Sequence, residues 1–386
     1  MIISGVPPMN GRSSSPTTLT AIEVGKLSAM WGEPPMLPVW KRPRCSSFWS
    51  GMPILPPAQN GSIAVAHNTS PYVSAYPWGV EGYGTKYTDP GTLPSGNGRS
   101  VAYTTAGDAI AITSSSSPRI QAYPWTKSGF GTKVSDPATI PSGVGSGVDF
   151  SPTGDAIVVS SWVTPFVLAY PWSGGGFGSK YSDPSSLPPA AANGVSFHPN
   201  GNAVVVGHNN EPYLTAYAWS GGFGAKFSDP STLPSSYGYS VDFSPAGNAV
   251  AVAHLLSPYC AAYSWSGSGF GAKFSDPLTT PTNDASCIAF SSTGTDVIVG
   301  HLNSPYVTAY PFSASGFGTK YSNPSPLAGD TYGVSFSRAS DAVSLAHSSV
   351  PLVSTYRWGP SGFGTRFSSP GTLPAGQGNG VAFSVV

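Results

Sequence analysis

Charged residues are scarce in this sequence. Only 9% of its 386 residues are Asp, Glu, Lys or Arg, and 17 basic residues balance 17 acidic ones. A nucleic-acid-binding surface needs clustered basic residues in excess, whereas seven of the basic residues belong to a motif spread evenly along the chain. We therefore expect no nucleic-acid partner.

Cysteine and long apolar runs are scarce as well. Cys45, Cys260 and Cys287 are an odd set without metal-site spacing, which indicates reduced thiols rather than a disulfide framework. No run is long and apolar enough to span a membrane, and the start of the chain lacks the basic leader and apolar core of a secretory signal. No phosphate loop, nucleophile elbow or zinc motif appears. We expect no membrane, no metal, no cofactor and no catalytic site.

What the sequence does contain is a tandem repeat of 46 or 47 residues. One anchor is the last aromatic residue of an AYPW-like motif, and a second anchor is the basic residue of an FGTKY-like motif, from Lys86 to Arg366. Both anchors occur seven times in the same rhythm, which fixes the number of units before any secondary structure is assigned. The aromatic anchors are Trp78, Trp125, Trp172, Trp219, Trp265, Phe312 and Trp358.

Each unit is predicted to contain four short strands. Runs of β-branched and aromatic residues are separated by Gly, Pro, Ser and Asn, and no segment of the repeats keeps a helical period. Within the runs, bulky and small residues alternate: Ile63 and Val65 share one face, Ala64 and Ala66 the other. The bulky face of one sheet can therefore pack on the small face of the next.

This pattern resembles WD-repeat-like β-propellers, in which a VxFSPxG turn joins the innermost strand to the second. The turn is written VDFSPTG at 148–154, VSFHPNG at 195–201 and VDFSPAG at 241–247. The resemblance implies an all-β, seven-bladed propeller of four-stranded blades over residues 56–386. Residues 61–88 lack an innermost strand, and the chain stops after one at Val381-Ala382-Phe383. We expect that last strand to complete the first blade and close the ring.

Residues 1–55 carry no repeat and are predicted to be a separate N-terminal arm. One interpretation is a disordered leader or a strap on the ring, and the other is a docking arm that binds a partner protein. Trp and Arg dominate interface energetics, so the candidate partner-binding residues are Trp31, Trp40, Lys41, Arg42, Arg44 and Trp49.

Five histidines are the first candidates for chemistry in the ring. His67, His208, His254, His301 and His347 occupy one repeat position, and Ser114 and Ser161 fill it in the other two units. Metal ligands must converge within a few ångströms, and a ring holds equivalent positions apart. We therefore expect a structural imidazole that bonds to a neighbouring blade or connection, and a structural role also for the repeated tryptophans.

Two kinds of aspartate are further candidates for chemistry. Asp89, Asp136, Asp183, Asp229 and Asp276 follow the basic anchor by three residues and precede Pro, which indicates an ion pair or a turn cap. Asp149 and Asp242 stand in two innermost strands, and paired carboxylates near a propeller channel are the one feature that favours glycosidase chemistry.

Residues that break the repeat are the better candidates for binding a specific partner, because repeated residues maintain the blade. On the loops between second and third strands they are Trp162, Asn209, Asn210, Glu211, Leu255, Leu256 and Leu302. Ordinary loop drift is the alternative explanation. Trp162 and the Leu pair would form an apolar patch suited to a partner.

The function predicted from these features is a non-enzymatic structural or binding module. A surface poor in Lys and Glu is typical of extracellular proteins, and a virus particle released by lysis needs no export signal. The repeats also resemble those of bacteriophage proteins, so we expect a virion component held to other virion proteins by its arm. One alternative is a propeller that binds host-surface glycans through Tyr237, Tyr239 and Tyr332; the other is a lactonase or glycosidase-like enzyme.

Overall fold

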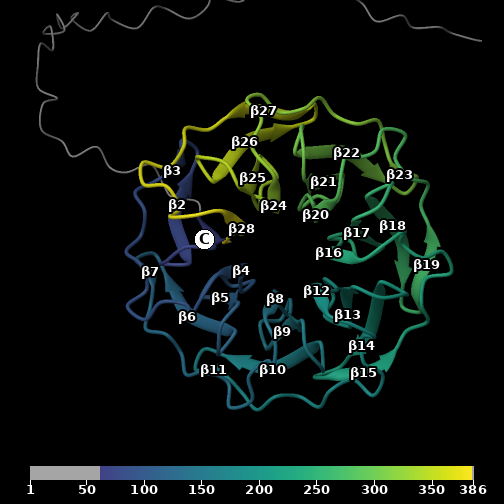
Figure 1. Ribbon diagram of the computed structural model, residues 1–386, viewed down its shortest axis with the longest axis horizontal. Helices are drawn as coiled ribbons and strands as arrows, with labels where there is room; N and C mark the ends of the chain where they lie inside the picture. The colour runs from purple at the N-terminus through teal and green to yellow at the C-terminus, as the bar shows by residue number, and fades with distance from the viewer. Residues whose placement is uncertain (1–60, 385–386) are drawn as a thin grey trace, which may run out of the picture. The chain divides into compact units, whose positions relative to one another are not determined.

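The computed structural model describes residues 61–384, which form seven four-stranded antiparallel sheets around a common centre (Figure 1). None of these residues lies in a helix, so no helix among them could cross a membrane. The predicted all-β, seven-bladed propeller with four strands per blade is confirmed. The candidate arm residues Trp31, Trp40, Lys41, Arg42, Arg44 and Trp49 lie outside the described residues.

The strands repeat in four classes from the centre outward (Figure 1). The innermost are β4 (Gly98–Tyr103), β8 (Gly145–Phe150), β12 (Ala192–Phe197), β16 (Gly238–Phe243), β20 (Ala285–Phe290), β24 (Thr331–Phe336) and β28 (Gly378–Phe383). The second are β1 (Gly61–His67), β5 (Ala109–Ser114), β9 (Ala156–Ser161), β13 (Ala203–His208), β17 (Ala249–His254), β21 (Asp296–His301) and β25 (Ala342–His347).

The two outer classes complete each blade. The third strands are β2 (Val73–Gly79), β6 (Ile120–Thr126), β10 (Val167–Ser173), β14 (Leu214–Trp219), β18 (Cys260–Ser266), β22 (Val307–Ser313) and β26 (Val353–Gly359). The fourth are β3 (Gly82–Tyr83), β7 (Gly129–Phe130), β11 (Gly176–Phe177), β15 (Phe223–Lys226), β19 (Gly269–Lys273), β23 (Gly316–Phe317) and β27 (Gly362–Arg366).

The ring closes where the sequence predicts. The strand order β28-β1-β2-β3 makes one sheet, with Ile63 opposite Phe383 and Val65 opposite Val381. Beyond these pairs, the Ser62 N–H donates to Ser384 Oγ at 2.7 Å. We call this sheet blade 1 and number the others in chain order, so that blade 2 is β4–β7 and blade 7 is β24–β27. Closure removes the sheet edges that an open array would expose.

Packing between blades follows the predicted alternation of large and small side chains. Ala64 and Ala66 of blade 1 pack against Ile110, Tyr123 and Trp125 of blade 2, and all five side chains are buried. The same relation recurs around the ring. Each sheet thus buries both faces, which leaves only the channel, the two flat faces and the rim for binding.

The anchor aromatic residue, a tryptophan in six blades and Phe312 in the other, holds each blade through edge-to-face contacts. Trp125 meets Phe130 of its own outer strand at 4.9 Å, and Tyr103 and Tyr87 at 5.2 Å each, measured between ring centroids. Such pairs contribute about 0.5–1.5 kcal/mol each beyond the area that they bury. The repeated motif therefore encodes the packing of the blade rather than a binding site.

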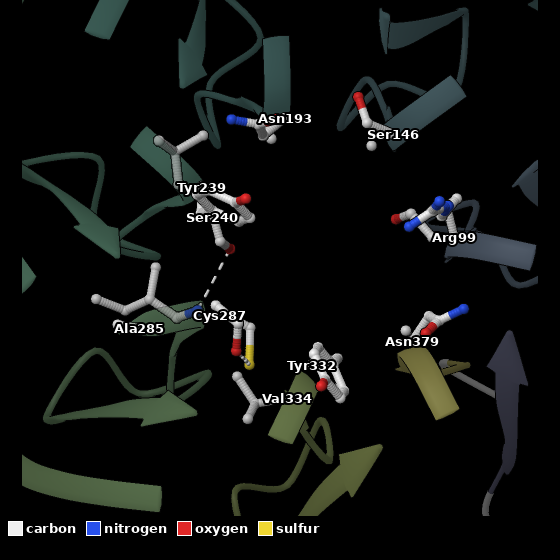
Figure 2. Close-up of a pocket in the computed structure, with 18 of the residues that line it drawn as sticks. Arg99, Ser146, Asn193, Tyr239, Ser240, Ala285, Cys287, Tyr332, Val334 and Asn379 are labelled. Atoms are coloured by element: carbon white, nitrogen blue, oxygen red, sulfur yellow. Dashed lines mark hydrogen bonds between the residues drawn. The ribbon is translucent and has the colours of Figure 1, made fainter. Parts of the chain in front are cut away.

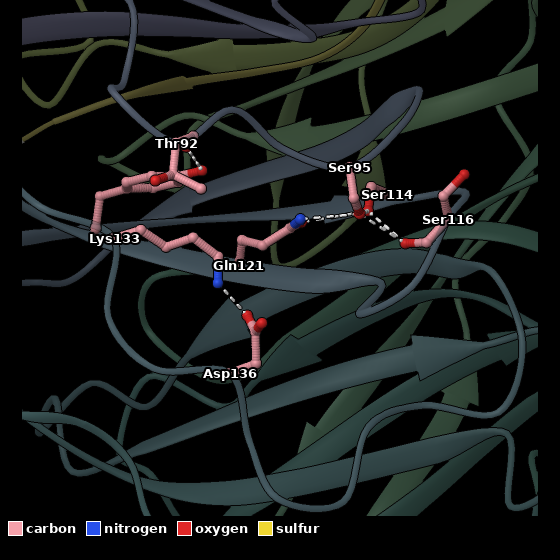
Figure 3. Close-up of polar contacts among 8 residues, drawn as sticks. Thr92, Ser95, Ser114, Ser116, Gln121, Lys133 and Asp136 are labelled. Atoms are coloured by element: carbon pink, nitrogen blue, oxygen red, sulfur yellow. Dashed lines mark hydrogen bonds and ion pairs between the residues drawn. The ribbon is translucent and has the colours of Figure 1, made fainter.

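The basic anchor and the Asp before Pro form an ion pair in five repeats: Lys86–Asp89, Lys133–Asp136, Lys180–Asp183, Lys226–Asp229 and Lys273–Asp276. Figure 3 shows the pair of blade 2, Lys133 and Asp136. In the same blade, Tyr123 Oη donates to the Thr92 carbonyl at 2.8 Å. The ion pair fixes the connection that follows blade 2, and the tyrosine bond fixes the connection that precedes it.

Candidate functional site

A cavity of about 400 Å³ opens at the centre of the ring, at the N-terminal ends of the innermost strands. All seven innermost strands contribute to its wall, and we call it the central cup. Its volume lies in the range of small-molecule sites. Figure 2 shows side chains from several blades arranged around its opening.

The wall of the central cup has three levels, set by position along the innermost strand. Second residues differ from blade to blade, third residues are small, and fourth residues are branched aliphatics that lie deepest among the lining residues. The second residues are Arg99, Ser146, Asn193, Tyr239, Ser286, Tyr332 and Asn379. The fourth residues are Val101, Val148, Val195, Val241, Ile288, Val334 and Val381.

The rim of the cup adds three apolar side chains from loops between second and third strands: Trp162, Leu255 and Leu302. The guanidinium of Arg99 lies over the ring of Trp162, 5.1 Å from its centroid. A cation over an indole face is attracted by the ring quadrupole. This contact links blade 2 to blade 3 and fixes where the positive charge of the cup stands.

The cup carries one charge of each sign among the described residues that line it, Arg99 and Asp284. Ala285, which follows Asp284, lies across the opening from Arg99 (Figure 2). The backbone of Asp284 is used by the fold, since its N–H donates to Asn283 Oδ1 and its carbonyl accepts from the Leu302 N–H. Its carboxylate has no hydrogen-bond partner among the described residues.

The aspartates Asp149 and Asp242 do not line the cup. Each is the fifth residue of its strand, one step below the aliphatic level, and accepts a backbone N–H of the next blade. Asp149 Oδ2 bonds Phe197 N and Asp242 Oδ2 bonds Phe290 N, both at 2.8 Å. Burial raises the pKa of each carboxyl to about 7, and the charge of Asp149 adds to the rise at Asp242. This geometry joins blades and gives little support to a glycosidase pair.

The five repeated histidines are fully buried, and four of them bond within their own blade. Their Nε2 atoms lie 2.9–3.0 Å from a hydroxyl oxygen seven residues later, on the third strand. The expected partner in a neighbouring blade or connection is therefore corrected, although His301 Nδ1 also lies 3.5 Å from Thr282 Oγ1 of a connection. The pairs are His67–Ser74, His208–Thr215, His301–Thr308 and His347–Ser354.

The two blades without histidine carry a larger residue at the partner position. Ser114 donates to Gln121 Oε1 at 3.3 Å, and Gln121 Nε2 donates to Ser95 Oγ at 2.9 Å (Figure 3). Ser161 is followed seven residues later by Leu168, which is 2% exposed. A large residue is thus paired with a small one in every blade, which is the signature of packing.

The predicted ring-loop residues fall into two groups. Trp162 and Leu255 line the cup, and Trp162 is 42% exposed. Asn209 supports the wall, because its Oδ1 accepts a bond from Asn193 Nδ2 at 2.7 Å. Asn210, Glu211 and Leu256 are not among the lining residues.

Sequence reasoning missed most of the second-level residues. Only Tyr239 and Tyr332 were considered, as glycan-binding tyrosines. The signal was present, because the second position of the innermost strand varies freely, whereas the third is small and the fourth is Val or Ile in every unit.

Comparison with known proteins supports the fold. No protein-family model matches the chain, and neither does any curated protein. Similar solved structures include the periplasmic gluconolactonase PpgL of Pseudomonas aeruginosa, with 14% identity and a TM-score of 0.66. A candidate 6-phosphogluconolactonase of Bacteroides uniformis has 11% identity and a TM-score of 0.65, and a functionally unknown protein of Desulfotomaculum acetoxidans has 15% and 0.63. Each comparison covers 84% of this chain and 99% of the other.

These comparisons overturn the predicted function. Of these three structures, the two whose descriptions name an activity are lactonases, and none is described as part of a virus particle. The prediction of a non-enzymatic virion component is therefore wrong, and the prediction that the protein is not an enzyme loses its support. At identities of 11–15% the likeness itself shows the seven-bladed fold and no more.

Proposed function

We propose that the protein is an enzyme that hydrolyses a sugar-derived lactone held in the central cup. The observation that carries this proposal is the convergence of residues that break the repeat, from all seven innermost strands, on one cavity of about 400 Å³. A polyhydroxylated molecule needs several polar groups in a mostly apolar pocket, and the cup offers tyrosine hydroxyl, guanidinium and carboxylate groups above a belt of aliphatic side chains. The lactonase descriptions of similar propellers point to the same substrate class.

The proposed chemistry needs one proton carrier. Water adds its oxygen to the lactone carbonyl carbon and gives a proton to Asp284. The ring carbon–oxygen bond then breaks, and the ring oxygen leaves as an alcohol after it takes that proton back. The product is the open hydroxy acid. General acid–base catalysis of this kind accounts for factors of about 10²–10⁴ in rate.

The test is a pH-stat assay of acid release from gluconolactone and 6-phosphogluconolactone, each compared with its uncatalysed rate. The full chain should accelerate at least one of them, and Asp284→Asn should lose about 100-fold or more. The matched control is Asp330→Asn, which changes the same repeat position in blade 7, outside the cup lining. No acceleration by the parent, or equal rates for parent and Asp284→Asn, would overturn the proposal.

A second candidate function is glycan binding without turnover. It is favoured by the exposure of two tyrosines near the mouth, Tyr237 at 42% and Tyr239 at 39%, because an exposed tyrosine offers a flat apolar face and a hydroxyl. Saturable binding of a neutral glycan, together with no acceleration of any lactone, would favour this candidate.

A further inference from the structure

Four of the seven second-level residues are consumed by the fold. Each donates a hydrogen bond to the carbonyl of the first residue of the next blade's innermost strand, and we call them latch residues. Ser146 Oγ reaches the Ala192 carbonyl at 2.6 Å, and Asn379 Nδ2 reaches the Gly98 carbonyl at 2.7 Å. The other two latch contacts are Asn193 to Gly238, at 3.1 Å, and Ser286 to Thr331.

The remaining three are Arg99, Tyr239 and Tyr332. All line the cup and are drawn around its opening in Figure 2. None of their side chains makes a hydrogen bond to another described residue, although each occupies the same strand position as a latch residue. The repeat is therefore broken in two different ways, once to join blades and once to leave large side chains in the cavity.

Arg99 is positioned without being neutralised. Its Cζ lies 5.1 Å from the centroid of the Trp162 ring, and no carboxylate pairs with the guanidinium among the described residues. Its Nε is buried and has no hydrogen-bond partner in the described structure. A buried N–H donor without a partner costs free energy, and a guanidinium fork matches a carboxylate or a phosphate in two parallel bonds.

The tyrosines supply the second half of the site. They stand in blades 5 and 7 with blade 6 between them, and in Figure 2 Tyr239 lies across the opening from Arg99 while Tyr332 lies at its lower edge. Tyr239 is 39% exposed, so its ring is accessible from the cup. A tyrosine offers a flat apolar face and a polar tip, which suit the C–H face and the hydroxyls of a sugar ring.

We propose that Arg99 is the specificity-determining residue of the central cup and that it binds an anionic group, a carboxylate or a phosphate, on a sugar whose ring contacts Tyr239 and Tyr332. This assignment rests on the proposed function for the location of the site and names the substrate class as an acidic sugar derivative. It requires no hydrolysis for its own test.

The test is calorimetric titration of the full chain with three probes: glucose, glucose 6-phosphate and glucuronate. At least one anionic probe should bind about tenfold or more tightly than glucose at low salt, and the tighter one identifies the group as phosphate or carboxylate. Arg99→Gln should abolish the preference, and Arg99→Lys should keep part of it, because a lysine retains the charge without the fork.

Two further variants separate charge from ring contacts. Arg338→Gln makes the same change of net charge on the exposed turn after β24, outside the cup, and should leave the preference unchanged. Tyr332→Ala should weaken all three probes by similar factors. Unfolding curves of each variant exclude misfolding as the cause.

The assignment is overturned if glucose binds as tightly as both anionic probes, if no probe binds at millimolar concentration, or if Arg99→Gln and Arg338→Gln have equal effects. These outcomes differ from failure of the proposed function. Binding of an acidic sugar through Arg99 without lactone turnover would leave this assignment standing and remove the hydrolysis. Turnover of neutral and anionic lactones at equal rates, unaffected by Arg99→Gln, would do the reverse.

Discussion

Seven residues after His254, Ala261 takes the place where the other four repeated histidines meet a hydroxyl, and the buried Nε2 of His254 has no hydrogen-bond partner among the described residues. Blade 5 therefore lacks a buried hydrogen bond that a hydroxyl side chain supplies in four other blades.

Ala261→Ser should stabilise the protein by about 1 kcal/mol, because it supplies the missing hydroxyl to a buried imidazole. The measurement is urea unfolding of parent and variant. Ser74→Ala in blade 1 is the reciprocal control and should cost a similar amount, since it creates the defect of blade 5. A destabilised Ala261→Ser would show that the histidine pocket of blade 5 has no room for the oxygen.

The buried histidines should make stability fall on acidification. Burial lowers the pKa of His67, His208, His254 and His347 from 6.5 to about 4. The unfolded chain therefore binds more protons than the folded one between these pH values, and the stability present above pH 6.5 is lost as the pH falls toward 4. The loss is on the order of 3 kcal/mol per histidine at most.

This pH dependence can be reduced by copying another blade. His208→Ser combined with Thr215→Leu reproduces the Ser161 and Leu168 pair of blade 3 and removes one titrating group. The slope of unfolding free energy against pH between 6.5 and 4 should decrease. An unchanged slope would mean that His208 does not contribute to it.

Asp149 should act in the opposite pH direction. Its folded pKa of about 7 lies above the unfolded value of 3.8, so stability is fully present below pH 4 and is lost as the pH rises through 7. Asp149→Asn keeps an oxygen for the Phe197 N–H and removes the charge. The variant should match the parent near pH 4 and be more stable than it at pH 8 in urea unfolding; Asp242→Asn should behave alike.

Substitutions of the latch residues should change stability, whereas substitutions of Arg99, Tyr239 or Tyr332 should change affinity. Asn379→Ala leaves the Gly98 carbonyl without its donor, so it should cost about 1 kcal/mol of stability and leave the affinity for an acidic sugar within about twofold. Tyr332→Ala should lower the affinity and change the stability less. Parallel unfolding and titration experiments check both, and a loss of affinity in Asn379→Ala with unchanged stability would contradict the distinction.

The fold was predictable from sequence because every blade repeats the same physical solution. The spacing of Trp78 to Trp358 counted the blades, and the missing innermost strand before Gly61 predicted the closure by Val381-Ala382-Phe383. The site was less predictable. Arg99 and Asn379 occupy one repeat position. Only the structure shows that Asn379 donates a hydrogen bond to the next blade's carbonyl and that Arg99 does not.

The histidine partners were also beyond sequence reasoning alone. The period places a histidine at the position of His67 in five blades, but it does not say whether the ring turns along its own sheet or toward the next one. The residue seven positions later, Ser74 in blade 1, indicates the direction of the ring. Where serine replaces the histidine, that later residue is large, as in Ser114 with Gln121 and Ser161 with Leu168, so the two side chains share one volume within the blade. The function could not be predicted from the repeated residues, because these residues maintain the packing of each blade.

The aliphatic residues at the deep level of the cup affect the passage of polar molecules through the centre of the ring. Val101, Ile288 and their five counterparts lie deepest among the lining residues, with the aspartate level beneath them. A polar molecule that passed this belt would exchange contacts with water for contacts with aliphatic side chains, which is unfavourable. On the proposed function, substrate and product would therefore compete for the same mouth of the cup, and slow product release would be measured as competitive inhibition by the product.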